Sequence, residues 1–209
     1  MKMDDIAIAD FFTRADGQYL CARWGRPIVP VVFGVGDASL AVFKGAIEAV
    51  VALAGHDTAE TDWELGANLM VFFCRDWAEL AEVPHLDRLL PDLGALVKRL
   101  QAADANQYRT FRFDEAGAIK AAFVFLRMDS HLEAAGADTL ALSQAVQTIL
   151  LWSDLAFQEA SPLAMLSGAA VIRPEVAAVI RAAYDPVLPA VAKDASHALR
   201  LTARVGMQS

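Results

Sequence analysis

The sequence predicts an α/β (α+β) fold in which helices pack on a single mixed β-sheet. Residues 38–54 carry apolar side chains at helical spacing, which indicates a long helix with one face turned to a core. Residues 68–74 form a nearly continuous apolar run, which is typical of a strand covered on both faces. Residues 108–113 alternate aromatic and polar side chains, and the apolar residues 118–126 return after a turn, which indicates an antiparallel hairpin.

The remaining elements follow from the spacing of apolar residues and from the positions of Pro and Gly. The run 19–33 favours a strand, but its prolines cannot donate backbone hydrogen bonds, so it should lie at a sheet edge or enter the sheet only near Val31. Helices are predicted over residues 6–12, 76–82, 86–102, 138–152 and from Pro174 to about Tyr184, with a partly helical segment over 187–204.

Length and composition predict one soluble, cytoplasmic domain. We expect this domain to span residues 1–209, with an N-terminal extension over 1–18 and a C-terminal segment over 190–209 that packs on the domain or trails it. Hydrophobic residues make up 56% of the chain, but charges interrupt every apolar run before it reaches the roughly 20 residues needed to cross a bilayer. The chain starts with acids where a signal peptide needs a basic region.

The cysteines and histidines offer no recognisable reactive centre. Cys21 and Cys74 are expected to be buried, reduced thiols, although a bridge between neighbouring strands is the alternative. No histidine lies three or four residues from another histidine or cysteine, so no helix face presents two metal ligands. The histidines are His56, His85, His131 and His197. The sequence therefore predicts no catalytic residue, no metal site and no cofactor.

The net charge of −8 and the pI of about 4.9 bear on possible partners. Residues 56–92 hold nine acids against Arg75 and Arg88 only, and no Lys or Arg occurs between Arg127 and Arg173. Nucleic-acid binding is not expected, because counterion release needs a basic surface. An acidic surface usually serves solubility. An acidic protein-interaction domain with a basic protein partner is nevertheless one alternative function.

A second alternative is an enzyme of unrelated class with a nucleotide bound near Gly34 and Gly36. These glycines form a G-x-G turn between the predicted strand and the predicted helix, where backbone N–H groups can approach phosphates. However, Ser39 occupies the third glycine position and Asp37 would repel a pyrophosphate. A plain strand-to-helix turn is the better interpretation.

The helix at 138–152 carries a narrow polar stripe of Ser143, Gln147 and, at its margin, Gln144, with apolar residues on both sides. A helix that is apolar nearly all round is usually buried, and buried amides and hydroxyls need hydrogen-bond partners. The stripe is therefore a candidate for a structural network or for the wall of a cleft. The solvent-exposed face of an ordinary amphipathic helix is the other interpretation.

The stripe also carries a resemblance to a known family. Ser143-Gln144-Ala145-Val146-Gln147 lies where a zincin metallopeptidase has H-E-x-x-H on its active-site helix, with two His ligands for zinc and a Glu that acts on the attacking water. The chain resembles a bacterial family of uncharacterised zincin-related (metallopeptidase-like) proteins. The further similar stretches are residues 23–28, 55–56, 122–125, 161–165 and 174–186, which ends in Tyr-Asp-Pro.

The departures from the zincin motif decide what the resemblance implies. Ser143 and Gln147 stand at the two His positions, Gln144 stands at the Glu position, and Ser153 stands where an extended motif has a third His. Ser and Gln are poor zinc ligands, and Gln cannot take a proton as Glu does. The resemblance therefore implies a zincin-like fold without metal or base, that is, a pseudoenzyme. Its former cleft, with these four residues as candidates, is expected to be filled or to bind a peptide-like or small ligand.

Overall fold

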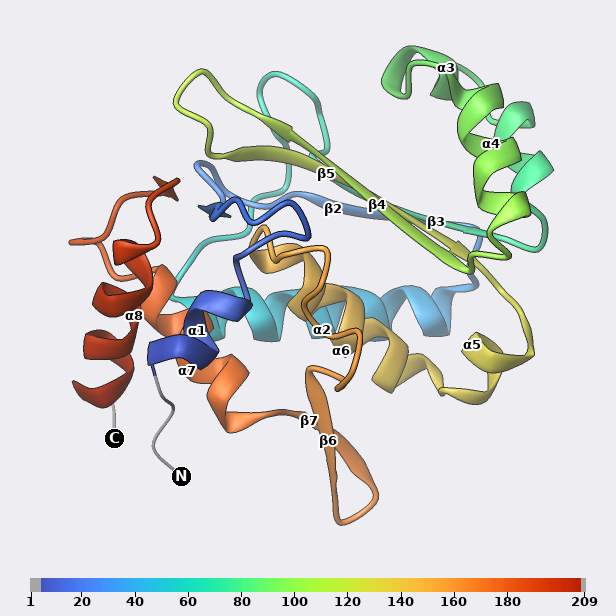
Figure 1. Cartoon of the computed structure of the whole chain (residues 1–209). Coiled ribbons are helices and arrows are strands. Elements are labelled where there is room, and N and C mark those ends of the chain that lie inside the picture. Colours follow the sequence, from blue (N-terminus) through green and yellow to red (C-terminus); the bar gives the residue numbers. More distant parts are fainter. Residues whose placement is uncertain (1–4, 208–209) are drawn as a thin grey trace.

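The computed structural model describes residues 5–207 of the chain. Its centre is a four-stranded sheet with the strand order β2-β3-β5-β4 (Figure 1). Strands β2, β3 and β5 run parallel, and β4 pairs antiparallel with β5. The predicted combination of helices with a mixed sheet is therefore confirmed. The strands are β2 (Pro30–Phe33), β3 (Leu69–Cys74), β4 (Gln107–Phe113) and β5 (Ile119–Arg127).

One face of the sheet is covered by two long helices, α2 (Asp37–Ala54) and α6 (Ala137–Ile149) (Figure 1). Apolar side chains of α2 and α6 meet Val71 and Val124 of the sheet in the larger of two hydrophobic cores. Gly55 ends α2 in the left-handed conformation, as the sequence predicts. Behind this layer lie three further helices, which are α1 (Asp5–Asp10), α7 (Pro174–Ala183) and α8 (Ser196–Met207).

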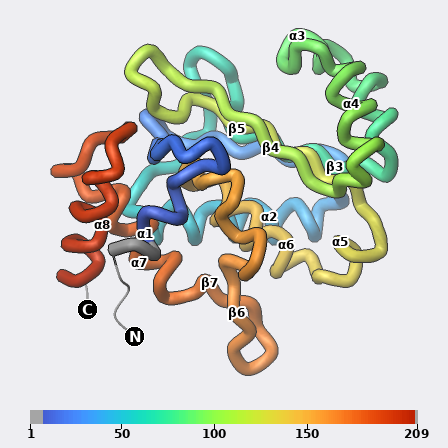
Figure 2. The backbone as a smooth tube through the Cα atoms, in the orientation of Figure 1, coloured from blue at the N-terminus to red at the C-terminus, as the bar shows by residue number. Residues whose placement is uncertain are grey.

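The opposite face of the sheet has a smaller cover. Here Phe72 and Phe125 contribute to the second core, which the leucines of three short helices complete. Figures 1 and 2 show α3 and α4 gathered at one end of the sheet rather than along its whole length. The three elements are the 3₁₀-helix η1 (Trp77–Glu82), α3 (Leu86–Leu89) and α4 (Leu93–Ala102).

Two small two-stranded sheets accompany the central one, so the prediction of a single sheet is wrong in this detail. The run 19–33 is divided between β1 (Cys21–Ala22), which pairs with β8 (Val191–Ala192), and β2, which is an edge strand as its prolines predict. The hairpin of β6 (Leu163–Leu166) and β7 (Ala169–Ile172) projects from the body (Figure 1).

Two predicted helices differ from the structure: one is interrupted, and the other ends earlier than predicted. The segment 86–102 is interrupted between α3 and α4, where Pro91 precedes a left-handed Asp92. The predicted helix at 138–152 stops at Ile149, because the N–H of Leu151 donates to the carbonyl of Ala22 at 2.9 Å and draws the chain into an extended conformation. The short α5 (Ser130–Ala134), which precedes α6, was not predicted.

Both terminal segments pack on the main core within the described residues. Phe12 is fully buried and its ring stacks on Trp152 at 5.4 Å between centroids. In the C-terminal segment, Leu201 of α8 is also fully buried. Residues 1–4 of the predicted N-terminal extension and residues 208–209 of the predicted C-terminal segment lie outside the described residues. No described helix has the length and apolar composition that a membrane crossing requires.

One half-buried histidine, His56, and one buried histidine, His197, should make the fold sensitive to mild acid. His56 donates from Nε2 to the carbonyl oxygen of Arg26 at 2.9 Å, and Nδ1 of His197 lies 2.9 Å from the Tyr19 hydroxyl. Burial lowers the pKa of both imidazoles below the ordinary value. As the pH falls through about 6.5, the unfolded chain therefore binds protons before the folded chain does, and stability present above that pH is lost.

We therefore expect the free energy of unfolding in urea to decrease between pH 7.5 and pH 5.5. The double variant His56→Gln/His197→Gln should be less stable at pH 7.5, because its polar contacts are altered, but its stability should change less over this interval. Parallel pH profiles for the wild type and the double variant would contradict the assignment.

Candidate functional site

The polar stripe of α6 faces the edge strand β4, where it contacts the guanidinium group of the half-buried Arg109. Nη1 of Arg109 donates to Oε1 of Gln144 at 2.8 Å, and Nη2 donates to Oε1 of Gln147 at 2.5 Å. Gln147 in turn donates to the hydroxyl of Ser143 at 2.9 Å, and Gln144 donates to Gln107 of β4 at 2.8 Å. The stripe is therefore a hydrogen-bonded network between helix and sheet.

Strand alternation explains why Arg109 reaches α6. Arg109 lies opposite Val124 in the β4–β5 register, and directly opposed residues point to the same face of a sheet. Val124 belongs to the core beneath α2 and α6, so Arg109 shares that side. The neighbouring Tyr108 instead lies opposite Phe125 and packs against the second core.

The network holds a cation without a carboxylate partner. The oxygens that accept from Arg109 are amide carbonyls of Gln107, Gln144 and Gln147, and the ion pairs of the described residues do not include Arg109. Burial lowers the pKa of Arg109 to about 10, so the guanidinium stays charged at neutral pH. Amides and a hydroxyl cannot act as the proton acceptor that hydrolysis of a peptide bond requires.

The structure brings three of the four predicted cleft residues together and leaves Ser153 apart. Gln144 is buried, while Ser143 and Gln147 are half-buried. The hydroxyl of Ser153 donates to the carbonyl of Thr13 at 2.6 Å, and none of its hydrogen bonds reaches Arg109 or the two glutamines. Ser153 therefore fastens the N-terminal segment to the core.

The described residues contain neither a cluster of metal-ligating side chains nor an exposed cysteine. Over residues 5–207, no group of three or more His, Cys, Asp or Glu side chains is placed to hold a metal ion. Cys21 and Cys74 are both free and buried. Burial raises the pKa of Cys21 to about 12 and the pKa of Cys74 to about 11, so both thiols are protonated at physiological pH and are poor nucleophiles in this state.

The G-x-G turn has a packing reason for its first glycine. Gly34 has φ +83°, and a Cβ atom there would lie 2.5 Å from the carbonyl oxygen of Phe73. A pocket of about 390 Å³ borders this turn, but Glu133 lines it, and Asp37 and Asp138 stand in the first turns of α2 and α6. The carboxylate of Glu133 would repel a pyrophosphate bound in this pocket, and the acids at the two helix N-termini offset the positive end of each helix dipole.

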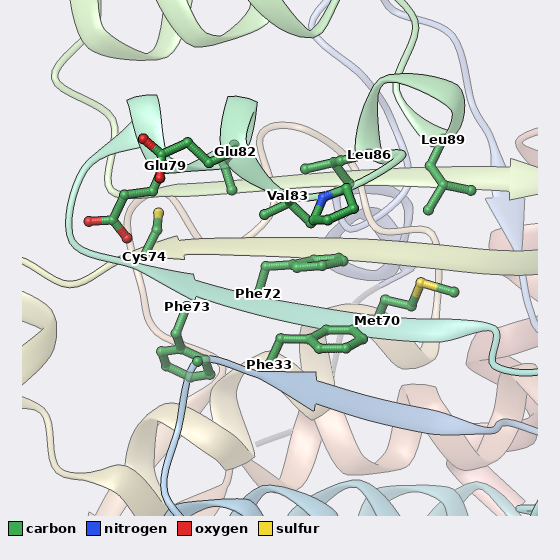
Figure 3. Close-up of a pocket in the computed structure, with 13 residues that line it drawn as sticks. Phe33, Met70, Phe72, Phe73, Cys74, Glu79, Glu82, Val83, Leu86 and Leu89 are labelled. Atoms are coloured by element: carbon green, nitrogen blue, oxygen red, sulfur yellow. The ribbon is translucent and has the colours of Figure 1, made fainter.

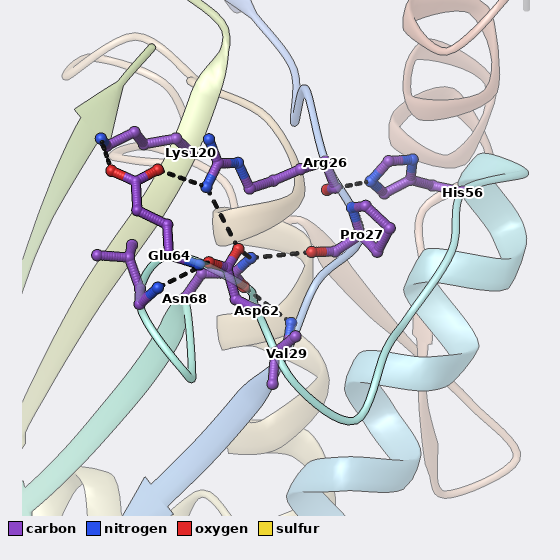
Figure 4. Close-up of polar contacts among 9 residues, drawn as sticks. Arg26, Pro27, Val29, His56, Asp62, Glu64, Asn68 and Lys120 are labelled. Carbon is purple, nitrogen blue, oxygen red and sulfur yellow. Dashed lines mark hydrogen bonds and ion pairs between the residues drawn. The ribbon is translucent and has the colours of Figure 1, made fainter.

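A second polar network lies at the opposite end of the parallel strands (Figure 4). The buried carboxylate of Asp62 accepts hydrogen bonds from Asn68 and from two backbone N–H groups of its own loop, and pairs with Arg26. Burial opposes the charge of Asp62, but these hydrogen bonds outweigh it and hold its pKa below the ordinary value. The network fixes a loop that presents Trp63, whose side chain is 83% exposed and faces the guanidinium of Arg26.

A third feature of interest is a cavity on the other face of the sheet, next to the helices that cover part of this face. We call it the aromatic groove; its volume is about 700 Å³. Met70, Phe72 and Cys74 of β3 form its floor together with Phe33 of β2 (Figure 3). The walls come from η1, from the Val83-Pro84 connection and from α3.

A row of stacked rings leads across the sheet into this groove. The centroids of Phe125 and Phe72 lie 5.0 Å apart, and those of Phe72 and Phe33 lie 4.8 Å apart, in both cases with nearly parallel planes. Phe72 is buried, whereas Phe33 is 45% exposed at the edge of the sheet. The groove is therefore the place where the apolar interior of this face opens to solvent.

The sequence interpretation missed both Arg109 and the groove. The alternation over residues 108–113 does not distinguish Arg109 from the other polar residues of the strand, and its partners on α6 lie 35 and 38 residues away in the chain. The only local signal for the groove was Phe33, a large aromatic residue at the end of a proline-containing edge strand.

Comparison of the chain with known proteins identifies no relative. No protein-family model matches the chain, and neither a curated protein nor a solved structure matches it significantly.

Replacing Arg109 by Met should destabilise the fold by about 1–3 kcal/mol, because buried amide oxygens would lose their donor. The matched control is Arg112→Met on the same strand but the opposite face, where the cost should stay within about 1 kcal/mol. Urea unfolding measures both.

The triple variant Arg109→Met/Gln144→Leu/Gln147→Leu should recover part of the loss, since it removes the unpaired oxygens as well. Equal losses for the Arg109 and Arg112 variants, or a triple variant that is less stable than Arg109→Met, would contradict the buried network.

Proposed function

We propose that the protein is a non-catalytic, zincin-like domain that binds a small apolar ligand. In this proposal the place of the zinc ion is taken by the guanidinium group of Arg109. The ligand binds in the aromatic groove, on the face of the sheet opposite to α6. The two halves of the proposal rest on different contacts.

The contacts of Arg109 support the non-catalytic half. Gln144 and Gln147 stand at positions of the zincin motif that would carry Glu and His, and both oxygens are already committed to the guanidinium. A divalent cation at this place would be repelled by the positive charge of Arg109 and would meet amides and a hydroxyl, which are poor zinc ligands. The former cleft is thus filled by a side chain of the protein itself.

The aromatic groove is the single observation that carries the binding half. Pockets that take small molecules are mostly apolar and measure about 300–1,000 Å³, and the groove of about 700 Å³ falls within this range. Its floor presents the ring of Phe33, and Leu89 on its wall is also exposed at 36%. A ligand that covers these side chains removes apolar surface from water, which favours binding.

An acidic interaction domain is the second candidate function, and Trp63 is the observation that favours it. Exposed tryptophans are frequent anchors of protein interfaces. Trp63 sits on a loop that the Asp62 network holds in place, with Glu60 and Glu64 beside it. Glu64 already pairs with two basic side chains of the protein, so a basic partner would find the apolar anchor and the exposed carboxylate of Glu60 at this loop.

Calorimetric titration with decanol, kept below its solubility limit, tests the binding half. We expect saturable binding of one molecule per chain. The variant Phe33→Ser should weaken the affinity about 10-fold or more, which corresponds to about 1.4 kcal/mol. The control is Phe113→Ser, which removes an equally exposed ring on β4 (41% against 45%) and should leave the affinity unchanged.

Metal analysis after incubation with zinc and dialysis tests the non-catalytic half. We expect no stoichiometric zinc. Tightly held zinc at one equivalent would overturn the pseudoenzyme assignment, and the absence of saturable decanol binding would overturn the binding site.

A further inference from the structure

The aromatic groove is apolar along most of its length and acidic at one end. Figure 3 shows Glu79 and Glu82 beside Cys74, while Met70 and Leu89 lie at the opposite end. Both glutamates are exposed on η1. The groove therefore has a polarity, and an occupant with a matching polarity fits it in one direction only.

The two glutamates are not neutralised by the protein. Lys and Arg side chains form ion pairs elsewhere in the described chain, and none of these pairs includes Glu79 or Glu82. The polar contact of Glu79 is with the backbone N–H of Arg75, at 3.3 Å. The negative charge also reaches the floor of the groove, since Glu79 and Asp76 add to the effect of burial in raising the pKa of Cys74.

The floor is long enough for an extended chain. Met70, Phe72 and Cys74 are alternate residues of β3 that point to the same face, and they span about 13 Å at about 3.3 Å per residue. Phe33 lies in register with Phe72 on the neighbouring strand and widens the floor to a second ring.

We propose that the ligand of the aromatic groove is an amphipathic cation, a single apolar chain with a protonated amine at one end. The chain lies along β3 over Phe72 and Phe33, and the amine faces Glu79 and Glu82. This inference rests on the proposed function, because it names the chemistry of the ligand that the groove takes. A fatty acid of the same length is disfavoured, since its carboxylate would meet the two glutamates or lose its hydration over Met70 and Leu89.

Three ten-carbon probes of identical chain length test the inference: decylamine, decanol and decanoate, each below its aggregation limit and at low ionic strength. An exposed charge contact contributes about 0.2–1 kcal/mol, so two of them predict that decylamine binds about 2- to 30-fold more tightly than decanol. Decanoate should bind most weakly. The preference for the amine should shrink as salt is added, because exposed charges are screened.

The charge variant is Glu79→Gln/Glu82→Gln, which should bring decylamine to the affinity of decanol and leave decanol unchanged. The matched control Glu60→Gln/Glu115→Gln removes the same net charge at exposed positions outside the groove and should keep the preference. In protein labelled at the methionine methyl groups, decylamine should shift the signal of Met70 and leave that of the exposed Met165 unchanged.

The possible outcomes separate this inference from the proposed function. Failure of all three probes to bind overturns the proposed function together with the inference. Equal affinities for decylamine and decanol overturn the inference, and so does a decanoate affinity higher than that of decylamine. In both cases the proposed apolar binding site is retained. If the Glu60/Glu115 control also loses the preference for decylamine over decanol, the preference is an effect of net charge, and the inference is overturned.

Discussion

The guanidinium of Arg109 between strand β4 and helix α6 is the interaction on which the account depends. A charged group that loses much of its hydration is tolerated only when polar atoms replace the lost water, and amide oxygens from Gln107, Gln144 and Gln147 do so for the half-buried Arg109. The planar fork of Arg fixes two of these amides at once, which ties the edge of the sheet to the helix. In the zincin-like fold that we propose, the same contacts occupy the side chains at the metal-binding positions.

The two faces of the sheet differ in how completely helices cover them. Helices α2 and α6 close the first face and leave the Arg109 network inside. On the second face η1, α3 and α4 are short and gather at one end, so the stacked rings of Phe125 and Phe72 continue to an exposed Phe33. The exposed apolar surface of this second face is the reason for proposing the binding site there.

The sequence predicted local elements well and long-range pairings poorly, for a physical reason. Helix α2 and strand β3 were found because periodicity and the glycine at the helix end are local properties. The role of Arg109 depends on the register of β4 against β5 and on the rotation of α6, which no single segment encodes. The groove likewise needs walls from η1 and α3, which are distant in the chain from Phe33 on its floor. The uncharged β6–β7 hairpin was missed because its alanines weaken the alternation that marks a strand.

The most direct test of the central claim is nuclear magnetic resonance of the arginine side chains, with Arg109→Met to assign the signal. Hydrogen bonds from both Nη atoms to fixed acceptors should slow rotation of the Arg109 guanidinium and its exchange with water, and excess zinc should leave the signal unchanged. A guanidinium that rotates and exchanges as fast as that of an exposed arginine, or one that zinc displaces, would contradict the account.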